Sequence, residues 1–215
     1  KVGSSAKAAL DMAFVSLLAQ EKGLELYEYL GAPKKLDVQT DITISLNATE
    51  TMIKDARDAC ESGLYILKIK LGGDISHAIA TTKAIAKELP EAKLLIDANQ
   101  AWSLEESLAY VNAVTDVKIE LLEQPVKADD LAALKIITNA TDIPILADEA
   151  AFTLSDVKKI VESKSANMIN VKLMKCGGLT KAVEILEYAR EMNVKCMLGS
   201  MLEGPVSINA AMNLA

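Results

Sequence analysis

The stretch ELLEQP, residues 120–125, contains the end of a short apolar strand pattern that finishes in an acidic residue, Glu123. Four similar patterns flank it, and they end in Lys70, Asp97, Asp148 and Lys172. Successive members of the five are separated by 27, 26, 25 and 24 residues. A strand, a helix and their two loops take about this many residues, so all five side chains are predicted at the carboxyl ends of successive parallel strands.

Short β-type patterns alternate with longer helical patterns along nearly the whole chain, which is typical of parallel β/α units. The predicted strands are Thr40–Leu46, Ile66–Lys70, Leu94–Asp97, Ile119–Glu123, Ile143–Asp148, Met168–Lys172 and Lys195–Ser200. The predicted helices between them are Thr49–Glu61, Ile75–Leu89, Leu104–Val114, Leu131–Thr138, Leu154–Ser163 and Leu179–Met192. A further helix, over residues 1–30 and capped by Ser4 or Ser5, precedes the first strand. We therefore expect an α/β fold, a (β/α)8 barrel of the TIM type, in which residues 1–215 form one domain with seven β/α units.

A doubly wound open sheet is the alternative fold, because it also alternates strands and helices. Its usual nucleotide-binding sequences, GxGxxG and GxxxxGK[ST], are absent from the chain. The glycine pairs at 72–73 and 177–178 are adequately explained as turns. The pattern therefore favours the barrel.

Composition excludes several classes of function. The net charge is −7 and the basic residues are not clustered, so neither nucleic acid nor a membrane surface is an expected partner. No apolar run approaches the roughly 20 residues that span a bilayer. Cys60, Cys176 and Cys196 lack any CxxC pairing, which favours a soluble protein of the reducing cytoplasm. His77 is the single histidine, so chemistry that depends on histidine is disfavoured.

The three acidic residues in the series, Asp97, Glu123 and Asp148, indicate a metal site. One such residue alone is more often a turn former or a helix cap. Three on consecutive barrel strands converge at the rim, where their charges would repel one another without a cation between them. An all-oxygen set of ligands suits Mg²⁺ first and Mn²⁺ second.

Two lysines flank the acidic residues. Lys70 closes the sequence K-I-K, so the two-residue period of a strand places Lys68 on the same face. Lys172 opens K-L-M-K on the strand that follows the acidic series. A lysine at a strand end is usually solvated or paired with a carboxylate. Two that point into one charged rim from opposite sides are candidates for an acid and base pair.

Five motifs together resemble the enolase superfamily in its muconate-lactonizing-enzyme subgroup: KIK at 68–70, DANQAW at 97–102, ELLEQP at 120–125, ADE at 147–149 and NVKLMKCGG at 170–178. Within that subgroup, TDITISLN at 40–47, KLMKCGG at 172–178 and GSMLE at 199–203 are most similar to dipeptide epimerases of the L-Ala-D/L-Glu type.

The resemblance implies a role for each polar position. The implied metal ligands are Asp97, Glu123 and Asp148, and the implied catalytic pair is Lys70 and Lys172. An electrostatic helper role falls to Lys68, and supporting contacts fall to Asn99 and Glu149, the latter with Lys172.

The implied reaction inverts the α-carbon of a small dipeptide by 1,1-proton transfer through an enediolate, with a small-molecule carboxylate as substrate. A cycloisomerase or lyase of the muconate cycloisomerase or o-succinylbenzoate synthase type stays open as an alternative, as does a catalytically silent barrel.

The sequence departs from the family's pattern in three respects. No segment corresponds to the family's N-terminal capping domain, and the eighth strand, with its Asp-x-Asp, is expected beyond Ala215. Ala150 stands where many relatives have serine. Because seven units would leave two unpaired strand edges, we expect the chain to associate as a homo-oligomer.

Overall fold

The computed structural model describes residues 3–33 and 37–215. They form two compact units. The five-strand unit comprises residues 40–150 and 163–167, and the two-strand unit comprises the other described residues. All seven predicted strands are present, alternate with helices and pair in parallel, which confirms the α/β barrel class. The expectation of a single domain over 1–215 stays a prediction.

In the five-strand unit the strands follow one another in chain order. They are β1 (Ile42–Ile44), β2 (Ile66–Lys70), β3 (Lys93–Asp97), β4 (Ile119–Glu123) and β5 (Ile145–Ala147). The bounds of β2 and β4 agree with the prediction, whereas β1 and β5 are shorter than predicted. Most of their residues on both faces are buried, which is typical of parallel strands covered by helices.

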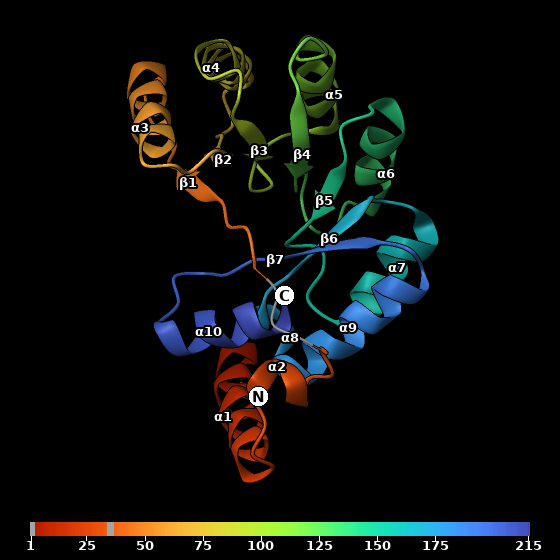
Figure 1. Ribbon diagram of the computed structural model, residues 1–215. Coiled ribbons are helices and arrows are strands. Elements are labelled where there is room, and N and C mark those ends of the chain that lie inside the picture. Colours follow the sequence, from red (N-terminus) through yellow and green to blue (C-terminus); the bar gives the residue numbers. More distant parts are fainter. Residues whose placement is uncertain (1–2, 34–36) are drawn as a thin grey trace. The chain divides into compact units, whose positions relative to one another are not determined.

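Four helices connect these strands: α3 (Thr49–Glu61), α4 (Ile75–Glu88), α5 (Leu104–Ala113) and α6 (Leu131–Ala140). Each packs against the next, so they form one layer beside the strands (Figure 1). A doubly wound sheet would divide its helices between two faces. The single layer and the sequential strand order therefore favour the barrel over the open sheet.

Side-chain caps determine where three of these helices begin. Asp74 accepts a hydrogen bond from His77 N at 3.0 Å, and Asp130 accepts one from Ala133 N at 2.9 Å. Ser103 forms a capping box at the start of α5. Each cap follows the loop that leaves the carboxyl end of a strand, so it also limits the length of the loops that carry the rim residues.

The two-strand unit contains β6 (Met168–Val171) and β7 (Lys195–Leu198), which pair in parallel. Its helices are α1 (Ser4–Glu21), α2 (Leu26–Tyr29), α7 (Leu154–Ser163, of which Ser163 belongs to the other unit), α8 (Leu173–Cys176), α9 (Leu179–Glu191) and α10 (Pro205–Leu214). The buried side of α1 packs against α8 and α9. Asp11 of α1 caps α9 from outside by accepting a hydrogen bond from Thr180 N at 3.1 Å.

Several local predictions were wrong. The single helix expected over residues 1–30 is two helices, because Gly23 turns the chain with a left-handed φ of 67° after α1. Neither Ser4 nor Ser5 caps α1, since the N-cap residue is Gly3. The four-residue helix α8 and the ten-residue helix α10 were not predicted, and Lys172 is the N-cap of α8 and not a strand residue. Residues 1 and 2 lie outside the described residues.

No helix within residues 3–33 and 37–215 combines the length and the apolar character needed to cross a membrane. The expected homo-oligomer stays a prediction.

Candidate active site

The carboxyl ends of β2, β3 and β4 bring three predicted residues into one row. Lys70 is the direct cross-strand neighbour of Asp97, and Asp97 is the direct cross-strand neighbour of Glu123. Neighbouring strands lie about 4.8 Å apart, so side chains on the same face of such a row are in reach of one another. The nearly constant spacing in the sequence therefore predicted this row correctly.

Lys68 lies between two of the acidic side chains. Its Nζ is 3.0 Å from Asp97 Oδ2 and 2.6 Å from Glu123 Oε2. Asp97 and Glu123 are fully buried, and Lys68 is nearly so, with 8% of the whole residue exposed. The Lys68 ammonium therefore compensates two carboxylates that water does not reach.

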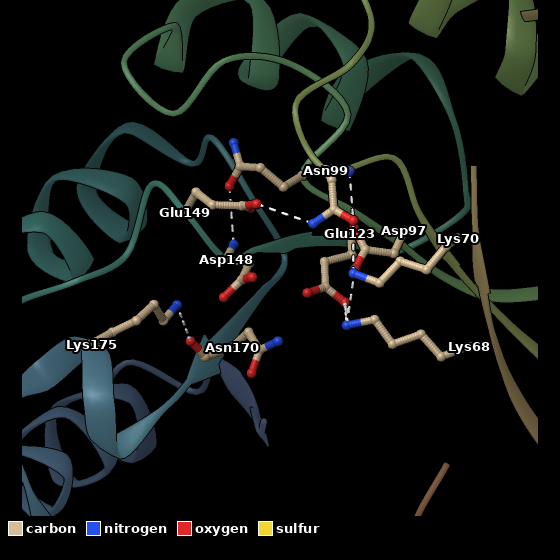
Figure 2. Close-up of polar contacts among 10 residues, drawn as sticks. Lys68, Lys70, Asp97, Asn99, Glu123, Asp148, Glu149, Asn170 and Lys175 are labelled. Atoms are coloured by element: carbon tan, nitrogen blue, oxygen red, sulfur yellow. Dashed lines mark hydrogen bonds and ion pairs between the residues drawn. The ribbon is translucent and has the colours of Figure 1, made fainter. Parts of the chain in front are cut away.

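Lys70 lies on the same face as Lys68, as the two-residue period predicted, and it is more exposed to the solvent. Its Nζ is 2.7 Å from Asp97 Oδ2 and 2.7 Å from Asn99 Oδ1 (Figure 2). One third of its side chain is exposed, at 33%, against 11% for Lys68. The Nζ atom of Lys70 is thus held by two contacts, while its side chain is partly exposed at the strand ends.

The electrostatics of this cluster are dominated by burial and by like charges. Burial raises the pKa of Glu123, and the charges of Asp97 and Asp148 raise it further, so that it reaches about 7 although Lys68 opposes the change. Burial alone would lower the pKa of Lys68, but the charges of Glu123 and Asp97 outweigh it and raise that pKa above its ordinary value. The pKa of Glu123 therefore responds to the negative charges of both other predicted ligands.

Asn99 connects the residues around Asp97. Its backbone N–H donates to Asp97 Oδ1 at 2.9 Å, and its Nδ2 donates to Glu149 Oε1 at 3.2 Å. The other carboxylate oxygen of Glu149 is buried and has no hydrogen-bond partner among the described residues. Asn99 adopts a left-handed φ of 45°, which turns the chain after β3, and its side-chain amide contacts both Lys70 and Glu149.

Lys172 belongs to the two-strand unit, where it is 6% exposed and precedes α8. Gly199, which directly follows β7, lies beside it: a Cβ atom on Gly199 would be 2.9 Å from Lys172 Cε and 2.5 Å from Asn170 Oδ1. The place of Lys172 opposite Lys70, and its contact with Glu149, stay predictions. A nearby buried lysine that the sequence did not single out as a site residue, Lys175, donates to the Asn170 backbone carbonyl at 2.8 Å.

The predicted ligands have the chemistry that a hard divalent cation prefers, but their side chains are not arranged as a complete metal site. Within the described residues, no three Asp, Glu, His or Cys side chains are already arranged to hold a metal ion. The predicted ligands are nevertheless all carboxylates, all at most 2% exposed, and their charges raise the pKa of Glu123. A cation would relieve that repulsion, and oxygen ligands are those that Mg²⁺ prefers.

Sequence reasoning missed one residue of this site, Gln124. It is fully buried directly after Glu123, and its side-chain oxygen accepts a hydrogen bond from Asp148 N at 3.0 Å. The available signal was its place inside ELLEQP, between a candidate ligand and a proline.

Comparison with known proteins finds close relatives. The chain is 58% identical over 214 residues to an L-amino acid-D/L-Glu epimerase from Sulfurimonas denitrificans, covering 100% of this chain and 63% of that protein. A substrate-liganded L-Ala-D/L-Glu epimerase from Bacillus subtilis superposes with a TM-score of 0.94 at 42% identity, covering 98% of this chain and 60% of the other. The Enterococcus faecalis dipeptide epimerase complexed with Mg and the dipeptide L-Leu-L-Tyr has a TM-score of 0.96 at 38% identity, with 99% and 60% covered.

The chain thus spans about three fifths of the length of these relatives. The family described as "Enolase C-terminal domain-like" matches residues 51–215, which is most of the sequence and includes every predicted site residue. The chain therefore belongs to the enolase C-terminal domain-like family.

Proposed function

We propose that this protein is a Mg²⁺-dependent epimerase that inverts the α-carbon of the C-terminal residue of a small dipeptide, of the L-Ala-D/L-Glu type. The observation that carries the proposal is the accessible amine of Lys70, held 2.7 Å from the buried carboxylate of Asp97 at the ends of neighbouring strands. Likeness to dipeptide epimerases over the whole chain supports the choice of substrate.

The ligands of the metal would be Asp97, Glu123 and Asp148, all of which are buried. When bound there, Mg²⁺ would act as a Lewis acid toward the substrate carboxylate and so acidify the neighbouring α-carbon. Mn²⁺ suits the same oxygen ligands.

The two lysines on either side of the α-carbon would move the proton. The Lys70 side chain is partly exposed, so its Nζ would take the α-proton from one face of the substrate after it has given up a proton of its own. Lys172 would return a proton to the opposite face, which inverts the stereocentre. The reverse reaction would use the same groups with their roles exchanged.

Lys68 is unsuited to the role of base. It contacts two buried carboxylates, Asp97 and Glu123, whose charges stabilise its protonated form, and its side chain is only 11% exposed, whereas Lys70 contacts Asp97 alone among the described carboxylates and is one third exposed. Its contribution is to hold the two carboxylates in place and to balance their charge. Asn99 would orient Lys70 by accepting its second hydrogen bond.

Proton exchange in deuterated water tests the proposal. The chain is incubated with Mg²⁺ and with L-Ala-L-Glu or L-Ala-D-Glu, and the glutamate α-proton is followed by NMR. Epimerisation predicts that deuterium enters at that carbon and that each isomer yields the other. A dehydrated or ring-closed product would favour the lyase or cycloisomerase instead, and absence of exchange with Mg²⁺ bound would favour a catalytically silent chain.

A cytoplasmic location is part of the same proposal. The thiols of Cys60, Cys176 and Cys196 are all free, which suits a reducing compartment.

A further inference from the structure

Gln124 joins three consecutive strand ends through its backbone. Its N–H donates to Leu146 O on β5 at 2.9 Å, and its carbonyl accepts from Gln100 N, in the loop after β3, at 2.8 Å. In a regular parallel ladder that carbonyl would instead accept the next hydrogen bond from β5, which comes from Asp148 N. The left-handed φ of Gln124, 37°, turns the carbonyl toward Gln100, so the Asp148 amide does not bond to it.

The side chain of Gln124 replaces that carbonyl as the acceptor. Its Oε1 accepts from Asp148 N at 3.0 Å and from Ala150 N at 3.1 Å. Its Nε2 donates to Val126 O at 3.0 Å, which fixes the orientation of the amide. Two backbone N–H groups thus converge on one buried oxygen, so residues 148–150 wrap around the end of the Gln124 side chain.

We propose that Gln124 is a positioning residue for the metal site, and this inference rests on the proposed function. Regular strand β5 ends at Ala147, and the backbone amide of Asp148 is held by the Gln124 side chain. The backbone at 148 sets the direction of the Asp148 carboxylate. Gln124 therefore fixes the proposed ligand Asp148, and it directly follows a second proposed ligand, Glu123, in the sequence. It holds Asp148 before any metal binds.

Gln100 offers a matched control. It is also a glutamine with a left-handed φ, 63°, and its Oε1 also accepts from a backbone amide, Ala128 N, at 2.9 Å. The segment that it holds carries no proposed ligand. Loss of either side-chain amide removes hydrogen bonds of the same kind, but only Gln124 acts on the backbone of Asp148.

The first test compares Gln124→Met with Gln100→Met in the full chain. Methionine has nearly the same length and cannot accept these bonds with comparable strength. Mg²⁺ affinity is measured by titration calorimetry. Gln124→Met should bind Mg²⁺ about 10- to 100-fold more weakly, as is typical when a group that orients a ligand is lost. Gln100→Met should stay within about twofold of the wild type, since no ligand moves.

Unchanged Mg²⁺ affinity in Gln124→Met would overturn the proposal, and so would equal losses in the two variants, because a general loss of stability would then explain both. If the wild type itself binds no Mg²⁺, the proposed function fails, and the second test still decides whether Gln124 holds Asp148.

That second test is amide hydrogen exchange in the metal-free protein. Its first part uses the wild type alone and so does not depend on whether a variant folds. The Asp148 and Ala150 amides should already be protected, and addition of Mg²⁺ should change their protection little. In Gln124→Met these two amides should exchange faster while Ala128 keeps its rate, and Gln100→Met should show the reverse. Exchange of the wild-type Asp148 amide at the rate of an exposed loop would overturn the proposal.

Discussion

Lys70 and Asp97 are direct cross-strand neighbours on β2 and β3, and their side chains meet, with Nζ 2.7 Å from Oδ2. The same carboxylate oxygen also receives Lys68 at 3.0 Å. Two ammonium groups therefore share one buried carboxylate. Because Lys68 also reaches Glu123, the chain itself balances the charge of two proposed metal ligands.

Replacement of Lys68 by methionine should therefore destabilise the metal-free protein strongly. Removal of one partner from a buried ion pair typically costs about 3–5 kcal/mol, because the other charge stays buried without compensation. Mg²⁺ should recover part of this loss by supplying positive charge to the same carboxylates. Urea unfolding in EDTA and in millimolar Mg²⁺ measures both effects.

Lys118→Met is the control for that change. Lys118 pairs with Glu120 at 3.5 Å, but its side chain is 89% exposed, so its loss should cost at most about 1 kcal/mol. A Lys68→Met protein as stable in EDTA as the Lys118→Met protein would contradict the assigned role.

A second prediction concerns the close approach of α1 to the start of α9. Gly178 has a φ of 122°, and a Cβ atom there would collide with the Asp11 side chain. Gly63, after α3, also has a left-handed φ, 87°, but a Cβ atom there would meet nothing within 4 Å. Alanine at Gly63 should cost about 1–2 kcal/mol of backbone strain. Gly178, with a ψ of −172°, lies in a region that essentially only glycine adopts, so alanine there should cost about 1–3 kcal/mol of strain. Gly178→Ala should cost about 1–3 kcal/mol more, because α1 must shift. Thermal unfolding of the two variants measures the difference. Equal losses of stability would show that α1 can move away from α9 at little cost.

Substitution of Gly199 tests the role of Lys172 without replacing the lysine itself. A Cβ atom on Gly199 would lie 2.5 Å from Asn170 Oδ1 and 2.9 Å from Lys172 Cε, so alanine should displace both side chains. A misplacement of about 1 Å can reduce a rate about 100-fold. Gly199→Ala should therefore slow α-proton exchange for the isomer that faces Lys172 and spare the other isomer. Gly204→Ala, where a Cβ atom meets nothing within 4 Å, should leave both rates unchanged. Equal slowing of both isomers in Gly199→Ala would indicate general disruption.

The row of rim residues could be predicted from the sequence because β/α units have nearly constant length. That regularity placed Lys70, Asp97 and Glu123 at one level, and the cross-strand register confirms it. The two-residue period of a strand likewise placed Lys68 beside Lys70, and their shared contact with Asp97 confirms this.

The place of Gln124 inside ELLEQP could have marked it as a residue of the site, but its contribution could not be predicted, because it depends on a left-handed φ and on complete burial. Neither is visible in a neutral residue between a glutamate and a proline. The helix α8 was missed for a related reason. NVKLMK is compatible with a continued strand, and the single helical turn ends only where Gly177 adopts a φ of 99°.

We propose that Lys70 and Lys172 serve opposite faces of one α-carbon. The most direct measurement is α-proton exchange in deuterated water for Lys70→Ala and Lys172→Ala, each with both isomers of the dipeptide. Both variants should lose epimerisation, because each lacks the group that completes the inversion. Each should still exchange the α-proton of the isomer that faces its remaining lysine, so the two variants should show opposite preferences. Loss of exchange from both isomers in one variant, with full activity in the other, would contradict the two-lysine account and favour a single-base lyase or cycloisomerase.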